Sequence, residues 1–151
     1  MTLSEGADAP TVTARNQDGE AVTLEFEGPT VLYFYPRDET PGCTTEARQF
    51  QLEYETYREA GVEVYGVSTD DVEDHRAFCE AEGLEFDLLA DPDAELAEAF
   101  GVDLRDGKTA RTTFFLADGE VKAVYEGVNP DGHARDVLMD ALEEGLVTLP
   151  E

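Results

Sequence analysis

A cysteine at the start of a helical pattern is the most reactive feature of the sequence. The apolar run 30–35 is followed by a loop that begins at Pro36, and Cys43 opens the helical segment beyond it. Backbone N–H groups at a helix start lack partners within the helix and carry positive partial charge, so they favour a cysteine thiolate over a thiol. A thiolate is a nucleophile, and the sequence therefore predicts sulfur chemistry at Cys43.

The chain has one other cysteine, Cys79, which lies beside Phe78 in a second helical segment. A cysteine in such a place is either a small buried hydrophobe or a partner in redox chemistry. The residues around Cys79 leave both interpretations open. The absence of a Cys-x-x-Cys motif argues against thioredoxin itself and against a disulfide reductase.

Alternating strands and helices position these cysteines. The expected strands cover residues 12–15, 21–24, 30–35, 62–67, 86–89, 112–116 and 121–125. The expected helices cover residues 43–60, 70–83, 92–100 and 134–145. This order predicts an α/β fold with a mixed central sheet flanked by helices, and the first two strands form an N-terminal β-hairpin at its edge. At 151 residues we expect a single domain over 1–151.

Two helix starts carry a capping signature. Asp70 with Glu73 three residues later marks the start of the second helix. Asp91 followed by Pro92 resembles an N-cap with proline at the first helical position, so we expect the third helix to begin at residue 92.

Other candidate sites are weaker. Gly107-Lys108-Thr109 resembles the end of a phosphate loop, but the preceding glycine is one residue too distant and the segment leads into a strand. His75 and His133 each stand alone, so we expect surface or helix-packing residues and no metal site. Carboxylates are so abundant that no pair stands out as a general acid and base. No cofactor is expected.

The charge excludes several partners. The chain has 36 acidic and 10 basic residues, giving a net charge of −26. Such a chain repels nucleic acid and anionic membranes. Because salt screens this self-repulsion, the composition favours adaptation to a salt-rich cytoplasm; the alternative is an acidic protein kept soluble by surplus carboxylates. Neither a basic leader nor a long apolar run is present, so a cytoplasmic location is expected.

The residues around Cys43 resemble a known family. Pro36-x3-Thr40-x2-Cys43 matches the signature of peroxiredoxins. The longer string 33–47, YFYPRDETPGCTTEA, is similar to the branch called bacterioferritin comigratory protein or peroxiredoxin Q, within the AhpC/TSA superfamily. Further similar segments are Gly6–Pro10, Gly66–Ser68, Leu88–Pro92 and Arg111–Phe114. The resemblance implies a thioredoxin-like fold and a thiol-dependent peroxidase.

The resemblance also implies roles for individual residues. Cys43 would be the peroxidatic nucleophile, and the Thr40 hydroxyl with the Cys43 backbone N–H would hold the peroxide. Pro36 would close the pocket against water. Arg111 would lower the thiolate pKa and bind the peroxide oxygens, and Glu46 matches a position whose carboxylate orients that arginine.

A resolving cysteine is the second requirement of this chemistry. Many members of the branch place it five residues after the first cysteine, where this chain has Arg48, whereas others place it in the following helix, where Cys79 lies. The resemblance thus implies a Cys43–Cys79 disulfide, recycled by a thioredoxin-like dithiol reductant. Because a disulfide needs a Cα separation of roughly 4.4–6.8 Å, we expect one or both helix ends to unwind.

Alternatives remain open alongside this prediction. If Cys79 is inert, the chain would be a one-cysteine peroxidase. If Cys43 only reports oxidant to a partner, the chain would be a redox sensor without turnover. We expect a monomer, as is common in the branch, with a weak dimer as the alternative.

Overall fold

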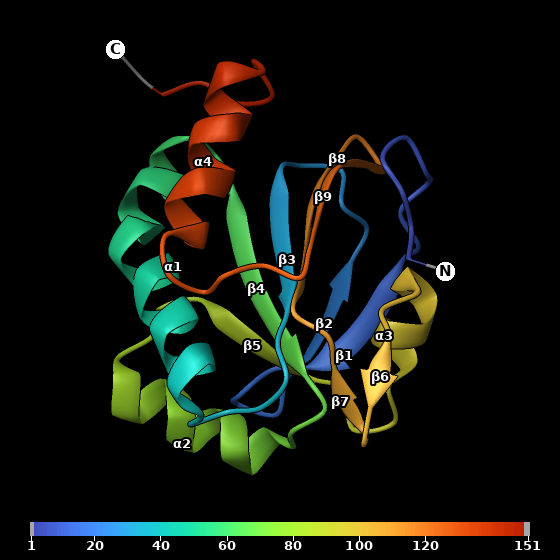
Figure 1. Cartoon of the computed structure of the whole chain (residues 1–151), viewed down its shortest axis with the longest axis vertical. Helices are drawn as coiled ribbons and strands as arrows, with labels where there is room; N and C mark the ends of the chain where they lie inside the picture. Colours follow the sequence, from blue (N-terminus) through green and yellow to red (C-terminus); the bar gives the residue numbers. More distant parts are fainter. Residues whose placement is uncertain (1, 150–151) are drawn as a thin grey trace.

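Seven strands form one mixed sheet in the computed structural model, which describes residues 2–149 (Figure 1). In chain order the strands of this sheet are β1 (Val12–Arg15), β2 (Ala21–Leu24), β3 (Thr30–Phe34), β4 (Glu63–Ser68), β5 (Asp87–Ala90), β8 (Thr112–Ala117) and β9 (Glu120–Glu126). Their spatial order is β2-β1-β5-β4-β3-β8-β9. β3 runs parallel to β4 on one side and antiparallel to β8 on the other, which confirms the predicted mixed sheet.

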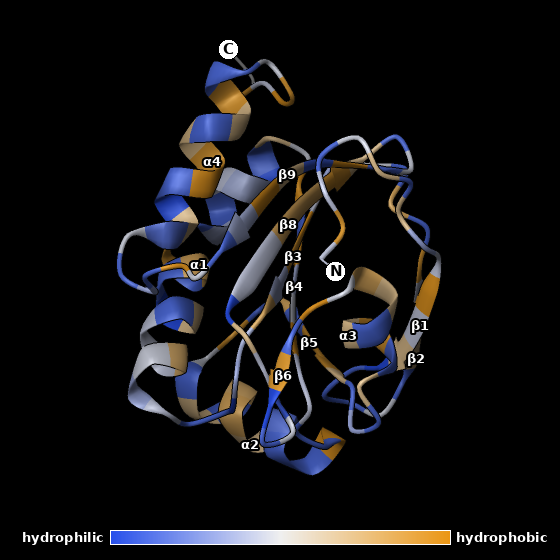
Figure 2. Ribbon diagram, turned by 45° about the vertical axis from the view of Figure 1, so that its right-hand side comes forward, coloured by the Kyte–Doolittle hydropathy of each residue, from blue (hydrophilic) through white to orange (hydrophobic). Residues whose placement is uncertain are grey.

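Four helices cover the sheet: α1 (Pro41–Glu59), α2 (Val72–Glu82), α3 (Glu95–Phe100) and α4 (His133–Glu143). Side chains of α1, α2 and α4 share one hydrophobic core, whereas those of α3 join a second core on the opposite face. Hydrophobic residues concentrate in the central strands, and the helices alternate hydrophobic and hydrophilic residues (Figure 2). The fold prediction of a sheet flanked by helices is confirmed.

Strand β3 belongs to both cores because successive side chains point to opposite faces. Val31 and Tyr33 enter the core beneath α1, and Leu32 and Phe34 enter the core beneath α3. All five residues of β3 are buried. The strand therefore fixes the position at which the chain leaves the sheet toward Cys43.

The N-terminal hairpin lies at one edge of the sheet, as predicted. β1 and β2 pair antiparallel through four residues each, and Arg15 of β1 joins the sheet opposite Ala90 of β5. The Asn16 side chain accepts hydrogen bonds from the backbone N–H groups of Asp18 and Glu20, which closes the turn.

The predicted start of the third helix is wrong. α3 begins at Glu95 and not at residue 92, because Ala94 adopts a left-handed backbone (φ 55°) that interrupts a helix. Asp91 nevertheless caps it, since its carboxylate accepts from the N–H groups of Leu96 and Ala97 at 3.0 Å.

Two further details differ from the sequence prediction. α2 is capped by Asp71, whose side chain accepts from the Asp74 N–H at 2.9 Å, and not by Asp70. The segment 107–109 contributes to a small hairpin, with strands β6 (Leu104–Arg105) and β7 (Lys108–Thr109) around an Asp-Gly turn. No helix within residues 2–149 is long and apolar enough to cross a membrane.

Candidate active site

Cys43 lies in the first turn of α1. Thr40 is the N-cap residue and Pro41 occupies the first helical position, so Cys43 is the third residue of the helix. The first backbone bond of the turn joins the Thr44 N–H to the Thr40 carbonyl at 2.8 Å. Within residues 2–149, the N–H groups of Gly42 and Cys43 have no backbone acceptor. These groups can therefore stabilise negative charge on the sulfur or on a bound oxygen.

The Thr40 hydroxyl is held at the edge of this turn. It donates a hydrogen bond to the Arg37 carbonyl at 2.9 Å and does not cap the helix. Because its proton is engaged, its oxygen lone pairs can accept a hydrogen bond from a ligand. Pro36 begins the same loop, two residues after the end of β3, and is half-buried.

Arg111 joins Cys43 to Glu46. It immediately precedes β8, 68 residues from Cys43 in sequence, and its Nη2 lies 3.5 Å from the cysteine Sγ. Its Nη1 donates to Glu46 Oε1 at 2.7 Å. One guanidinium therefore binds the carboxylate and the sulfur through separate nitrogens, a geometry that the point charge of a lysine cannot reproduce.

Gly42 leaves space for this guanidinium. A Cβ atom at Gly42 would lie 3.1 Å from Arg111 Nη2 and 3.6 Å from Pro130 Cγ. Arg111 thus crosses directly over the backbone of the first turn. The absence of a side chain at residue 42 is part of what lets the arginine reach the sulfur.

Glu46 is fully buried at the base of the site. Burial raises the pKa of its carboxyl to about 7, and the charge of Arg111 only partly opposes this effect. Its second oxygen, Oε2, has no hydrogen-bond partner within the described residues. The carboxylate therefore acts on the site through Arg111.

Cys79 lies in α2, within the same hydrophobic core as Cys43, and both cysteines are free thiols. Burial raises the pKa of the Cys79 thiol to about 12, and nearby carboxylates, of which Asp38 contributes most, add to the rise. In this conformation Cys79 is a thiol and a poor nucleophile. The start of α1 and helix α2 lie at the same end of the sheet (Figure 1).

A buried polar group beside the site was missed by the sequence analysis. His75, expected as a surface or helix-packing residue, is fully buried, and its Nδ1 lies 2.6 Å from Asp38 Oδ2. Tyr35 donates to the other oxygen of Asp38 at 2.5 Å. The available signal was the position of His75 one helical turn before Cys79, on the inward face of the helix, where an imidazole needs a partner.

Asp38, Asp70 and His75 bring three metal-ligating groups within 4.8 Å of one another. Their polar atoms already form hydrogen bonds with one another and with neighbouring groups. Asp70 Oδ2 accepts from the Asp38 N–H and the Ser68 hydroxyl, both at 2.7 Å. The group is explained by these hydrogen bonds, and the expectation of no metal stays a prediction.

The second histidine, His133, is also buried, and its Nε2 bonds the Thr113 hydroxyl at 2.8 Å.

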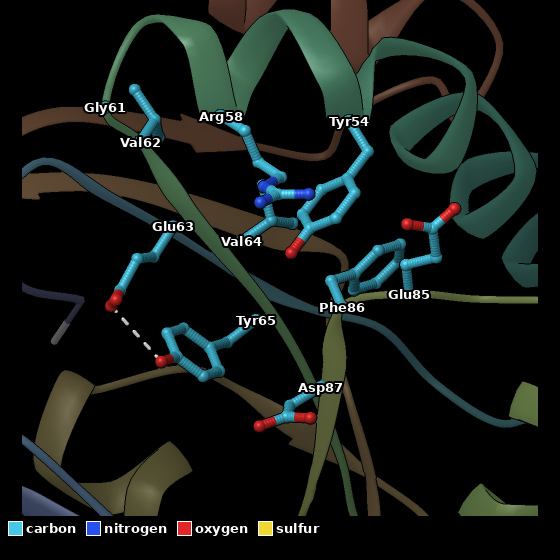
Figure 3. A pocket seen from close by; sticks show the side chains of 10 residues that line it. All are labelled: Tyr54, Arg58, Gly61, Val62, Glu63, Val64, Tyr65, Glu85, Phe86 and Asp87. Carbon is cyan, nitrogen blue, oxygen red and sulfur yellow. Dashed lines mark hydrogen bonds between the residues drawn. The ribbon is translucent and has the colours of Figure 1, made fainter.

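A separate hollow of about 400 Å³ lies where β4 and β5 begin (Figure 3). Arg58 extends over the ring of Tyr54 there, and Tyr65 donates to Glu63 at 3.2 Å. Neither cysteine lines this hollow. This hollow is therefore not part of the site around Cys43.

The fold and the site together define a class of protein. The fold is a thioredoxin-like α/β sheet, and a cysteine lies in the helix turn that follows a central strand, in contact with an arginine. These features define a thiol-reactive protein of the thioredoxin-like class.

The comparisons with known proteins agree with this class. The model of the AhpC/TSA family matches residues 6–124. Peroxiredoxin Q, chloroplastic, from Triticum aestivum is 42% identical over 142 residues, which are 90% of this chain and 65% of the relative. This chain thus spans about two thirds of that relative's length.

Two solved structures are similar over nearly their whole length. Peroxidoxin BcpB from Mycobacterium tuberculosis has a TM-score of 0.85 at 32% identity, covering 91% of this chain and 95% of the other. Bacterioferritin comigratory protein from Xanthomonas campestris, studied for alkyl peroxide reduction, has a TM-score of 0.81 at 33% identity, covering 89% and 91%. The chain belongs to the AhpC/TSA family, and within it to the peroxiredoxin Q and Bcp branch.

Proposed function

We propose that this protein is a thiol-dependent peroxidase in which Cys43 reduces hydrogen peroxide and organic hydroperoxides. The observation that carries the proposal is the contact of Arg111 Nη2 with Cys43 Sγ at 3.5 Å, in a helix turn with unpaired N–H groups. The family supports this activity, and the alkyl peroxide reduction named for the Xanthomonas protein supports organic substrates.

In the first step the Cys43 thiolate attacks one peroxide oxygen. The S–O bond forms as the O–O bond breaks, so sulfur is oxidised to a sulfenic acid and the second oxygen leaves as hydroxide or alkoxide and takes a proton. Arg111 and the Cys43 N–H would stabilise the charge that develops on the oxygens, and the Thr40 oxygen would accept a hydrogen bond from the peroxide O–H. Pro36 would shield the site from bulk water, and Glu46 would orient the arginine.

In the second step Cys79 captures the sulfenic acid. The Cys79 sulfur attacks the Cys43 sulfur, an S–S bond forms, and the hydroxyl leaves as water after gaining a proton. While Cys79 is buried its raised pKa keeps it protonated. Unwinding of α2 would expose the thiol to water and return its pKa toward the ordinary range, so movement and activation would coincide.

A dithiol protein of the thioredoxin type would then reduce the disulfide by thiol–disulfide exchange. Each cycle converts one organic hydroperoxide to an alcohol and one water, or one hydrogen peroxide to two waters, and one dithiol to a disulfide. We propose that this cycle operates in the cytoplasm in a monomeric protein without a cofactor.

A one-cysteine cycle is the second candidate. The burial of Cys79 and its pKa of about 12 favour it, because a thiol that never leaves the core cannot resolve a sulfenic acid. An external thiol would then reduce Cys43 directly.

Mass analysis under non-reducing conditions after one equivalent of peroxide separates the two candidates. The two-cysteine cycle predicts loss of two hydrogens and a peptide crosslink between Cys43 and Cys79. Addition of oxygen atoms at Cys43, with Cys79 unmodified, would support the one-cysteine cycle. No modification of Cys43 would contradict the peroxidase proposal.

A further inference from the structure

The polar group at the end of β3 contains a closely bonded pair. His75 Nδ1 lies 2.6 Å from Asp38 Oδ2, and both residues are buried. His75 Nε2 lies 3.0 Å from the Leu89 carbonyl, at the far side of the imidazole. Tyr35 donates to Asp38 Oδ1 at 2.5 Å. Every polar side-chain atom of this Asp38–His75 pair therefore has a partner.

The partners determine where the protons lie. The Leu89 carbonyl can only accept, so His75 Nε2 carries a proton. A second proton must lie between Nδ1 and Oδ2, since two acceptors would repel at 2.6 Å. With two protons the pair is neutral as a whole, which allows it to remain buried.

The hydrogen bond of this pair joins the loop that precedes Cys43 to the helix that carries Cys79. Asp38 lies two residues before Thr40, in the loop that leads to Cys43. His75 lies four residues before Cys79, so both side chains occupy one face of α2. A second bond ties the same loop to the start of this helix, where Asp70 accepts from the Asp38 N–H at 2.7 Å.

Two requirements of the proposed cycle conflict at this connection. Attack on peroxide requires the loop of Thr40 to be fixed beside Cys43. Disulfide formation requires Cys79 to leave its place in α2, and a helix that unwinds around Cys79 also withdraws His75, one turn earlier on the same buried face, from Asp38. The same contact supports the first step and opposes the second.

We propose that Asp38 and His75 are positioning residues that hold α2 and the Thr40 loop in the peroxide-reactive conformation and separate only for disulfide formation. The inference rests on the proposed two-cysteine cycle. Because the pair slows resolution, it also sets how long the Cys43 sulfenic acid survives, and therefore how much is oxidised further to sulfinic acid at high peroxide concentration.

The variant His75→Leu removes the imidazole, and Asp38→Asn with His75→Leu also removes the buried charge that the first change would leave unpaired. A hydrogen bond to a charged group changes an equilibrium by about tenfold or more. In rapid-mixing experiments the rate constant of Cys43 with peroxide should fall by about tenfold, whereas the rate of disulfide formation should rise by about tenfold. The peroxide concentration that half-converts Cys43 to sulfinic acid should rise accordingly.

The matched control is Glu82→Gln, which breaks an exposed ion pair between Arg48 and α2 without touching the Thr40 loop. It should leave the peroxide step unchanged. A role of His75 in stability alone would lower both rates in the His75→Leu variant, and that result would overturn the proposal. Equal disulfide rates in this variant and in the wild type would overturn it as well.

A measurement on the wild-type protein covers the case in which the variants do not fold. The short bond to Asp38 should give the His75 imidazole N–H a strongly downfield proton resonance in the reduced protein. The proposal predicts that this resonance disappears in the Cys43–Cys79 disulfide form. A resonance that persists in the disulfide form would overturn the proposal while leaving the peroxidase function intact. If no such disulfide forms in the wild type, the two-cysteine cycle fails, and the role of the pair with it.

Discussion

Arg48 on α1 forms an ion pair with Glu82 on α2, three residues beyond Cys79. By resemblance to the branch, residue 48 is a position where many members carry a resolving cysteine. In this chain the same position contacts the helix that carries the other cysteine. Any cysteine that resolves Cys43 within the chain must therefore come from α2, because Cys79 is the second of only two.

The first prediction concerns Cys79→Ser. This variant should lose at least about tenfold of its turnover with a thioredoxin-type reductant, because the sulfenic acid then has no partner thiol within the chain. The single-turnover reaction of Cys43 with peroxide should stay unchanged. Full turnover in Cys79→Ser would assign the chain to the one-cysteine cycle.

A gain-of-function variant completes this test. Arg48→Cys in the Cys79→Ser background places a thiol five residues after Cys43, in the same helix. A disulfide between Cys43 and the introduced thiol, with recovered turnover, is expected, because Cys43 lies in the first turn of α1, where the helix can fray and move Cys43 toward residue 48. Arg48→Ser in the same background is the matched control and should recover nothing.

The second prediction concerns Arg111. Arg111→Lys keeps a positive charge but loses the planar fork that binds Glu46 and Cys43 together. We expect the second-order rate constant for peroxide to fall by about 10²-fold, the size typical for loss of one stabilising donor. Arg105→Lys, an exposed arginine in the neighbouring β6–β7 hairpin, is the control. Equal rates for the two variants would exclude a role of Arg111 in the peroxide step.

The third prediction concerns pH and stability. The folded protein retains the Glu46 proton up to about pH 7, whereas an unfolded chain releases it near 4.3, so this residue makes the free energy of unfolding fall as pH rises through that window. Burial lowers the pKa of His133 to about 4, and its contribution therefore rises with pH between about 4 and 6.5. The two contributions offset each other over most of this range.

Glu46→Gln isolates the contribution of the carboxyl group. Relative to wild type, the variant should gain about 3 kcal/mol in the free energy of unfolding between about pH 4.5 and pH 7, because only the wild type has a group whose pKa is near 7 when folded and near 4.3 when unfolded. Urea unfolding at several pH values measures this difference. A difference between the two proteins that does not change with pH would show that Glu46 does not titrate in this window.

The fourth prediction concerns salt. With a net charge of −26, repulsion between carboxylates should destabilise the folded state at low ionic strength. Raising KCl from about 0.1 M to 1 M shortens the screening length from about 10 Å to about 3 Å and should raise Tm by on the order of 5 °C. The gain should level off above that concentration, as screening does. A Tm that is constant or falls with KCl would contradict adaptation to high salt.

Local patterns predicted most of the fold. Continuous apolar residues identified the buried strand β3. The second helix was predicted to end at residue 83, and Gly83 there has the left-handed backbone (φ 64°) that is typical of a helix end. Each of these features depends on residues that are close together in the sequence, so local sequence patterns could predict it.

The failures share a different cause. Asp70 and Asp71 are both competent caps, and the choice between them was decided by Asp38, 32 residues earlier, whose N–H binds Asp70. The start of α3 depended on the backbone of Ala94, a residue with no special turn propensity. The pairing of Asp38 with His75 arises because the parallel strands β3 and β4 end side by side, which no local pattern encodes.

The candidate site also had a part that could be predicted from the sequence and a part that could not. The string around Cys43 and the distant Arg111 could be named in advance only through the family resemblance. The contact between them and the burial that raises the pKa of Glu46 required the folded chain.

Steady-state peroxide consumption with a catalytic amount of protein tests the central claim most directly. With a thioredoxin-type reductant in excess, the wild-type protein should consume many equivalents of hydrogen peroxide per chain, and Cys43→Ser should consume none above background. Consumption by the wild type that stops after one equivalent, with the reductant still present, would contradict the peroxidase function and support a redox sensor.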